Sequence, residues 1–336
     1  MLKYYIAIRI KGESPMDIDY LLTLQHFRER IHDALTPFME FISLFAVSCL
    51  ILIPAFIYWC TDKRIGLYSL SSYALSSVLN VVIKLTACVY RPWIRDSRII
   101  PAGDSVRTAT GYSFPSGHTT NAVSIYGCLA KSTWKKHRLI SVICVFLILL
   151  TAFSRNYLGV HTPQDVIVAV LLGSAVIFGM GKLFEYLQTC PEKENKILAG
   201  GIAFCIAALI YISVKPYPRD MVNGELLVDP YLMMKDGFGC IGRLAAFCIS
   251  RFAEKKWVRY TPSLSLKTAV LGAAGAVITL LIIALGDSLP EAVFGMHWGA
   301  FAQNFIMMSF IILIWPAVMK QCSKGREVPS QDHKQS

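Results

Sequence analysis

Residues 139–165 read LISVICVFLILLTAFSRNYLGVHTPQD. The first part of this stretch, Leu139 to Ser154, is apolar, whereas the remainder carries Arg155, His161 and Asp165. A helix of about 20 apolar residues crosses the hydrocarbon core of a bilayer. The stretch therefore predicts a membrane helix that delivers three polar side chains to one membrane face.

The rest of the chain has the same character. Of its 336 residues 54% are hydrophobic and only 16% are charged, with a mean hydropathy of +0.50, which is too apolar for an ordinary soluble domain. We expect an all-α, polytopic helical membrane protein with eight to nine transmembrane helices. The apolar runs that predict them are Phe41 to Cys60, Leu67 to Tyr90, Ser116 to Ala130, Leu139 to Ser154, Val166 to Gly181, Ile197 to Val214, Thr268 to Leu285 and Gly299 to Met319.

Two segments are open to more than one interpretation. Phe238 to Phe252 contains Arg243 and Arg251, so it fits a span, an interfacial helix or a re-entrant piece, since an arginine at mid-depth costs a few kcal/mol. Asp17 to Asp33 places leucines, Phe27 and Ile31 near one helical face, with charged residues largely opposite. This pattern favours an interfacial helix, and a surface helix on a cytosolic segment is the alternative.

The formal net charge of +11 does not indicate a nucleic-acid partner, because the basic residues alternate with the apolar runs. If 238–252 crosses the membrane, the basic loops near Lys63, Lys135, Lys193 and Lys255 fall on one side. Short cytoplasmic loops are enriched in lysine and arginine, so that side should be cytoplasmic. The basic N-terminal tail, which falls on the other side, runs against this assignment.

The ten cysteines include no Cys-x-x-Cys pair. Most lie in apolar runs, where small buried hydrophobic side chains are the default interpretation. The sequence contains no disulfide framework, no metal-ligand spacing and no cofactor motif, so we expect neither metal nor cofactor.

The first polar motif combines Lys84 with Arg91 and Pro92. Seven residues are close to two helical turns, so both cations can project from one face toward one point. An ionisable residue inside a membrane is a functional hypothesis by default. The alternative is that Lys84 extends its stem to reach the headgroups while Arg91 marks the interface and Pro92 ends the helix.

The second motif is Pro115-Ser116-Gly117-His118, just before an apolar run. It predicts a loop that enters a helix, where free N–H groups favour an anion. Gly117 permits close approach of the backbone, Ser116 adds a donor, and His118 would stand beside the anion with a proton to deliver. The alternative is ordinary helix capping by Ser116 or Thr119.

The third motif runs from Ser154-Arg155 to His161 and Asp165. Thr162 can cap a helix whose first residue is Pro163, which places Asp165 in the first turn. Asp165 can then accept the Nδ1 proton of His161 and leave Nε2 free to attack, the role that carboxylates play in catalytic dyads. The alternative is that Thr-Pro-x-Asp is simply a normal helix opening.

Together the three motifs place every one of these residues at a span end on one predicted face. Three cations, Lys84, Arg91 and Arg155, would neutralise an anion there, which suits phosphoryl transfer by positioning and electrostatic stabilisation. The pattern Lys-x6-Arg-Pro, Pro-Ser-Gly-His and Ser-Arg-x5-His-x3-Asp resembles the signature of the type 2 phosphatidic acid phosphatase superfamily. This superfamily includes lipid phosphate phosphatases and vanadium-dependent haloperoxidases, and all three parts match without substitution.

The resemblance implies roles for the site residues. His161 would be the nucleophile that forms a phosphohistidine, Asp165 would orient it, and His118 would protonate the leaving oxygen and later activate water. The phosphate would be held by Lys84, Arg91, Ser116, Gly117 and Arg155. No metal would take part.

The resemblance also suggests how the chain is divided. We expect an N-terminal tail and interfacial helix in 1–37, a membrane-embedded phosphatase core with a helical bundle in 38–214, an additional transmembrane region in 215–322 and a disordered tail in 323–336. The family's common membrane enzymes have six core spans with three before the first motif, whereas this chain has two plus the amphipathic segment. The C-terminal region carries no motif, and its acidic residues and His297 are interpreted as interface residues.

The leading functional hypothesis is an integral-membrane, metal-independent phosphatase acting on a lipid phosphate or diphosphate. A phosphotransferase using the same phosphohistidine is the alternative enzyme, and a phospholipid-binding or transport protein is the non-enzymatic one. Localisation in a bacterial inner membrane, with the site on the extracytoplasmic face, fits the short loops and the charge distribution. The partners expected are a phosphorylated lipid and the bilayer, with no nucleic acid. The identity of the lipid and the oligomeric state do not follow from the sequence.

Overall fold

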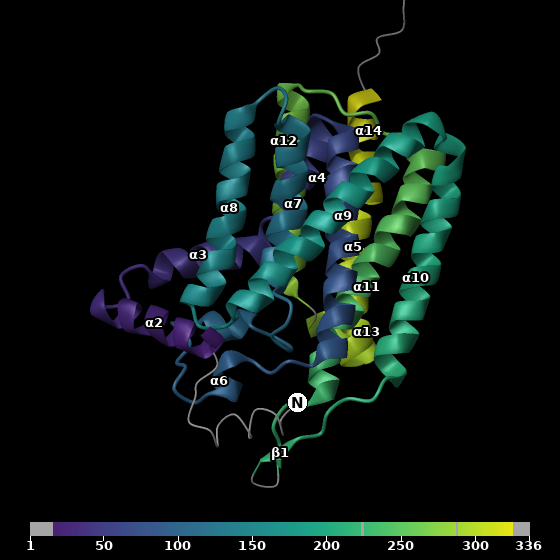
Figure 1. Cartoon of the computed structure of the whole chain (residues 1–336). Helices are drawn as coiled ribbons and strands as arrows, with labels where there is room; N and C mark the ends of the chain where they lie inside the picture. The colour runs from purple at the N-terminus through teal and green to yellow at the C-terminus, as the bar shows by residue number, and fades with distance from the viewer. Residues whose placement is uncertain (1–15, 223–224, 287, 325–336) are drawn as a thin grey trace, which may run out of the picture.

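A computed structural model of the chain describes residues 16–222, 225–286 and 288–324, and it is a helical bundle (Figure 1). A two-stranded antiparallel hairpin is the one sheet in these ranges. The helices are α2 (Met16–Arg30), α3 (Thr36–Ser48), α4 (Leu52–Cys60), α5 (Lys63–Ala87), α6 (Pro92–Arg95), α7 (Gly117–Thr133), α8 (Arg138–Tyr157), α9 (Pro163–Thr189), α10 (Glu194–Val214), α11 (Pro230–Ala253), α12 (Leu266–Leu285), α13 (Ser288–Ser309) and α14 (Trp315–Lys324). The hairpin strands are β1 (Met221–Val222) and β2 (Glu225–Leu226), and short 3₁₀ and π segments occupy Ser105–Thr108, Pro191–Lys193, Glu254–Val258 and Phe310–Ile314.

The helix predicted in Asp17 to Asp33 exists as α2, but its buried face differs from the prediction. Phe27 is exposed, whereas Arg28 is buried. The reason is that Arg28 has polar partners inside: its guanidinium pairs with Asp33 at 2.8 Å and donates to the carbonyl of Ile100 at 2.8 Å. A buried ion pair of 2.6 Å between Arg95 and Asp17 adds a second link. Helix α2 therefore holds the loop that follows α6.

The run from Phe41 to Cys60, which was predicted as a single span, is bent. It divides into α3 and α4, which meet at an angle of 50°. Pro54 lies in the first turn of α4, and a proline removes one backbone donor and crowds the preceding turn. The helix consequently breaks just before it.

Helices α5, α7, α8 and α9 form the centre of the molecule. Helix α7 packs on α5, α8 and α9, and α5 begins where Asp62 accepts a hydrogen bond from the backbone N–H of Ile65 at 2.9 Å. The predicted start of α9 is confirmed, with Thr162 as the cap and Pro163 as the first residue. The carboxyl ends of α5 and α8 and the amino ends of α7 and α9 meet at one end of the bundle, together with α6 (Figure 1).

The segment from Phe238 to Phe252 belongs to α11, which packs on α13, α10 and α5. This helix has 24 residues and is therefore about 36 Å long, so the segment is part of one long helix packed in the bundle. Two glycines let α13 approach closely. A Cβ added to Gly242 would lie 2.4 Å from the carbonyl oxygen of Phe301, and one added to Gly239 would lie 2.8 Å from Asn304 Nδ2.

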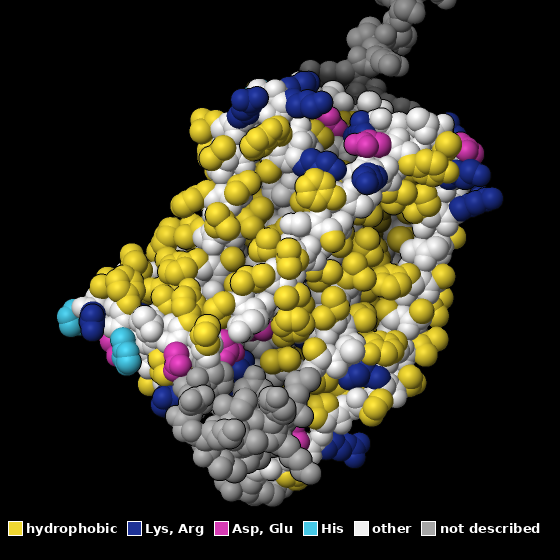
Figure 2. All heavy atoms as spheres, in the orientation of Figure 1, with side chains coloured by type: hydrophobic (Ala, Val, Ile, Leu, Met, Phe, Trp, Pro, Cys, Tyr) yellow, Lys and Arg dark blue, Asp and Glu magenta, His cyan; other side chains and the backbone are white. Residues whose placement is uncertain are grey.

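In the described ranges six helices are long and apolar enough to cross a membrane, or seven if the bent α3–α4 pair is one span. Eight or nine were predicted. The difference arises because α7 has only 17 residues and α11 carries charged side chains. Figure 2 shows hydrophobic side chains over the middle of the bundle and basic ones along the end that bears the α7–α8 connection. The chain is an integral membrane protein built of helices.

Candidate active site

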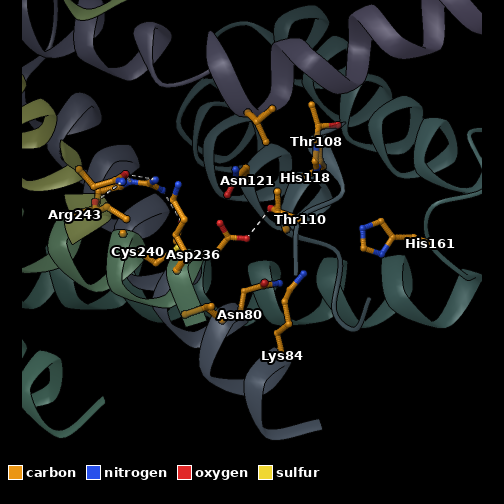
Figure 3. Close-up of a pocket in the computed structure, with 18 of the residues that line it drawn as sticks. Asn80, Lys84, Thr108, Thr110, His118, Asn121, His161, Asp236, Cys240 and Arg243 are labelled. Atoms are coloured by element: carbon orange, nitrogen blue, oxygen red, sulfur yellow. Dashed lines mark hydrogen bonds between the residues drawn. The ribbon is translucent and has the colours of Figure 1, made fainter. Parts of the chain in front are cut away.

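A cavity of about 270 Å³ opens among α5, the loop before α7, α7 itself, α11 and α13. In Figure 3, His161 lies at one side of it and Arg243 at the other, with Lys84, Asn80, Thr110 and Asp236 between them. The three sequence motifs, far apart in the chain, thus supply one wall of one cavity. The residues that line it are Val47, Ser77, Asn80, Val81, Lys84, Arg91, Thr108, Thr110, Gly117, His118, Asn121, His161, Lys235, Asp236, Gly239, Cys240, Arg243, Ala300 and Asn304.

His161 lies in the short connection between α8 and α9 and is almost fully buried. Its Nε2 is 2.9 Å from Nη1 of Arg91, and its Nδ1 is 3.3 Å from Oδ2 of Asp165. A guanidinium can only donate, so Nε2 must be the accepting nitrogen and the ring proton resides on Nδ1. The nitrogen that carries the electron pair is therefore Nε2, which accepts from Arg91.

Asp165 is held in place by more donors than the sequence analysis foresaw. Its Oδ2 accepts hydrogen bonds from the backbone N–H of Thr162 at 2.8 Å and from the hydroxyl of Ser113 at 2.6 Å. Asp165 thus caps α9 and faces His161 at the same time, so both interpretations of the motif apply. Ser113 was missed. It lies outside the three motifs, and only the folded loop brings it to Asp165.

The surroundings of His161 disfavour its protonation. Burial, followed by the positive charges of Arg91, Arg155 and Lys84, holds the pKa of the His161 imidazole well below its usual range. Both causes act in the same direction, because desolvation and like charge penalise the imidazolium. His161 is therefore neutral at physiological pH.

Lys84 and Arg91 reach the same loop, but not by extending from one helix as predicted. Helix α5 ends at Ala87, and Cys88 adopts a left-handed conformation there with φ 48°. Lys84 Nζ donates to the carbonyl of Tyr112 at 3.0 Å, and Arg91 Nε donates to the carbonyl of Gly111 at 3.1 Å. The turn after α5 brings the two cations together around adjacent residues of this loop.

Two buried polar groups near His161 lack partners. The Nε and Nη2 of Arg155 and the Nε2 of His118 have no hydrogen-bond partner among the described residues. Arg155 is fully buried and uses only its Nη1, which donates to the hydroxyl of Ser43. Unpaired buried donors are costly, and an anion with several oxygens would satisfy them.

The Pro115–His118 segment enters α7 as predicted. Ser116 caps the helix, with its hydroxyl accepting from the backbone N–H of Thr119 at 3.4 Å, and Gly117 lines the cavity. Asn80 of α5 supports this turn and was missed by the sequence analysis. Its amide donates to the hydroxyl of Thr120 at 2.8 Å. Its signal was present as polar residues 77, 80 and 84, which share one helical face.

Other polar residues singled out in the sequence lie elsewhere. Ser154 donates to the carbonyl of Thr151 at 2.7 Å and so supports only its own helix. Asp220 accepts from Tyr90 at 2.6 Å, and Asp229 caps α11. His297 Nε2 lies 2.8 Å from the carbonyl of Tyr231. The side chain of residue 225 lies outside the described part of the chain.

Asp236 is the exception among the acidic residues of the C-terminal region that were interpreted as interface residues. It lies in α11 and accepts a hydrogen bond from the hydroxyl of Thr110 at 2.7 Å. The carbonyl of Thr110 in turn accepts from Nη2 of Arg91 at 2.7 Å. The C-terminal helices are therefore connected to the cation that touches His161.

The family model described as the PAP2 superfamily matches residues 65–189. Residues 65–189 are therefore similar to the PAP2 superfamily, and we call them the PAP2 segment. It contains α5 to α9 and all three motifs, whereas α10 to α14 lie beyond it.

Several curated proteins are similar to parts of the chain. An undecaprenyl-diphosphatase of Sulfolobus acidocaldarius is 32% identical over 120 residues, which are 34% of this chain and 53% of that protein. Phosphatidylglycerophosphatase B of Bacillus subtilis is 29% identical over 158 residues, or 45% of this chain and 73% of that protein. A lipid A 4'-phosphatase of Porphyromonas gingivalis is 28% identical over 139 residues, or 37% and 58% of the two chains.

The chain spans about half the length of the first of these relatives. No solved structure gives a significant match.

Proposed function

We propose that this chain is a membrane phosphatase that removes the terminal phosphate of a lipid phosphate or diphosphate through a phosphohistidine on His161. The observation that carries the proposal is the pair of contacts made by His161: Nε2 lies 2.9 Å from Nη1 of Arg91, and Nδ1 lies 3.3 Å from Oδ2 of Asp165. A phosphate oxygen that takes the Arg91 N–H would release the Nε2 electron pair for attack. The substrate class rests on the relatives, whose names specify a diphosphatase and lipid phosphatases.

In the first step Nε2 of His161 attacks the phosphorus. The N–P bond forms, the P–O bond to the lipid breaks, and the leaving oxygen takes a proton from His118. Asp165 stabilises the positive charge that develops on the ring. His118 enters this step as the imidazolium, the form favoured by a bound phosphate.

In the second step His118 accepts a proton from water. The hydroxide oxygen attacks the phosphorus, the N–P bond breaks, and inorganic phosphate and free His161 result. The phosphoryl oxygens are neutralised by Lys84, Arg91 and Arg155, with Ser116 and Gly117 contributing at the start of α7. We propose that no metal takes part, because three cations converge on this end of the cavity.

We further propose that the site opens to the extracytoplasmic face of a bacterial inner membrane. The exposed basic residues of the α7–α8 connection lie at the opposite end of the bundle (Figure 2), and such residues favour the cytoplasm. Cys322, which is exposed on α14 at that basic end, should resist a membrane-impermeant thiol reagent in intact cells and react after permeabilisation. Reaction in intact cells would reverse the orientation.

The central experiment measures inorganic phosphate release by purified protein in detergent with EDTA, from a panel of lipid phosphates and diphosphates. We expect turnover by the parent chain and none above background by His161→Ala. Alkaline quenching of a reaction with labelled substrate should trap phosphate on His161. Unchanged activity of the variant would contradict the assigned nucleophile, and transfer to an added alcohol in place of water would identify a phosphotransferase.

A further inference from the structure

The cavity extends well beyond the phosphate-facing residues. Its far side is formed by α11 and α13, which lie outside the PAP2 segment and carry none of its motifs. Figure 3 shows Arg243 on this far side, across the cavity from His161. These helices thus add a polar wall that the first phosphate does not need.

Arg243 is held by neutral groups. Its Nη2 and Nε donate to Oδ1 of Asn304 at 2.6 and 3.2 Å, and its Nη1 donates to Tyr73 Oη at 2.6 Å and to Ser77 Oγ at 3.3 Å. None of the ion pairs found in the described ranges includes Arg243. Four of its five N–H groups are thereby used, which fixes the direction of the guanidinium. The carboxylate of Asp236 lines the same cavity but forms no ion pair with Arg243.

Arg243 lies deeper in the bundle than the phosphate-facing cations. Its partner Ser77 precedes Lys84 by seven residues on α5, or about 10 Å along the helix axis. The end of α5 that bears Lys84 faces the loops, so Ser77 is nearer the middle of the bilayer. When a lipid places its phosphate at Lys84 and Arg91, the atoms between the phosphate and the tails extend along α5 from Lys84 toward Ser77, and so toward Arg243.

We propose that Arg243, supported by Asn304 and Ser77, is a second anion subsite that binds a negatively charged group located between the scissile phosphate and the tails. The ligand class is a lipid headgroup with two anionic centres, such as a phosphomonoester joined through glycerol to a phosphodiester. A cation in a cavity of the bundle that has no ion-pair partner among the described residues attracts such a group. This inference rests on the proposed function, since it describes how the same site chooses its lipid.

The test compares two substrates and two arginines. Phosphatidylglycerophosphate carries the second anion, and phosphatidate lacks it. For Arg243→Gln we expect the ratio of kcat/KM for these lipids to fall about tenfold or more, the size of a lost charge-assisted hydrogen bond. The matched control is Arg251→Gln on the same helix, whose guanidinium pairs with Glu194 at 2.7 Å outside the cavity; its ratio should stay unchanged.

A loss of equal size on both lipids would make Arg243 a structural tether, and an unchanged ratio would remove the subsite. Binding to the His161→Ala protein separates this inference from the proposed function. Adding Arg243→Gln to that variant should weaken phosphatidylglycerophosphate about tenfold more than phosphatidate. If this difference appears although the parent chain hydrolyses neither lipid, the proposed function fails and the subsite stands. If it is absent, the subsite fails whatever the turnover.

Discussion

The PAP2 segment and the C-terminal helices contribute to the same cavity in different ways. Segment 65–189 supplies both histidines and the cations around them, and its residues are fixed by turns and helix starts. Helices α11 and α13 supply Asp236, Arg243 and Asn304, whose side chains reach the cavity across helix faces. The comparison suggests that the first region determines the chemistry and the second determines which lipid is accepted.

The largest effect is expected from Asp165→Asn, which tests whether the PAP2 segment determines the chemistry. The amide oxygen can still take the Oδ2 position and accept from Thr162 and Ser113, but the negative charge that stabilises the developing imidazolium of His161 is lost. We expect kcat to fall by about 1000-fold, as when an amide replaces the carboxylate behind a catalytic histidine. Phosphate release at saturating lipid measures this loss.

Thermal unfolding is the control for Asp165→Asn. The midpoint should shift little, because an amide oxygen still caps α9. A large shift together with the loss of activity would mean that Asp165 mainly supports the fold. A kcat within tenfold of the parent value would contradict its role in orienting His161.

A smaller effect is expected from the C-terminal side, where Asp236 acts on Arg91 through Thr110. Asp236→Ala removes the acceptor of the Thr110 hydroxyl, so the loop that holds Arg91 loosens. The loss of one buried hydrogen bond predicts a fall in kcat/KM of about tenfold. Vanadate, a phosphate mimic, should inhibit this variant more weakly by a similar factor.

Asp236→Asn separates position from charge, because the amide oxygen can still accept from Thr110. We expect it to retain most of the kcat/KM and of the vanadate affinity. If Ala and Asn variants lose vanadate affinity equally, the negative charge of Asp236 matters more than its hydrogen bond. If neither loses any, the C-terminal helices do not position Arg91.

The same contrast explains what the sequence could predict. The helical membrane fold and the start of α9 follow from apolar runs and from local capping chemistry at Thr162 and Pro163, which act over a few residues. The three motifs were found because each lies within a short stretch of sequence, although the first and the third pass from one helix to the next. Ser113, Asp236 and Arg243 were not placed in the site, because each reaches it through contacts between elements distant in sequence. The bend at Pro54 was missed because hydropathy does not register a lost backbone donor.

Ser113→Ala tests how much the hydrogen bond from Ser113 to Asp165 contributes to the chemistry of the PAP2 segment. It removes one donor from Oδ2 of Asp165 while the backbone N–H of Thr162 remains. We expect a loss of about fivefold in kcat, since one of several hydrogen bonds to a charged group disappears. Ser113→Thr, which keeps the hydroxyl, is the matched control and should recover part of the rate. Equal rates for alanine and parent would show that Ser113 is dispensable.

The smallest expected effect is the change of kcat/KM with pH. It should depend on the cations of the PAP2 segment and not on those of α11. Burial and the cations of the PAP2 segment hold the pKa of His161 well below its usual range. Protonation of the nucleophile should therefore cost less than about twofold in kcat/KM between pH 7.5 and 6.5, because kcat/KM reports the free enzyme. The lipid phosphate itself titrates near pH 6, so variants must be compared on one substrate.

Removing a positive neighbour stabilises the imidazolium and raises the pKa of His161. The residual activity of Arg91→Gln should accordingly begin to fall at a higher pH than that of the parent. Arg243→Gln should not change the pH at which kcat/KM begins to fall on the acidic side. The charges that depress the pKa of His161 come from Arg91, Arg155 and Lys84 and not from α11. Suppose instead that the fall of kcat/KM at acidic pH began at a higher pH in Arg243→Gln, by as much as in Arg91→Gln. Arg243 would then act on the pKa of His161 as strongly as Arg91 does. That result would contradict the assignment of the chemistry to the PAP2 segment and of lipid selection to α11 and α13.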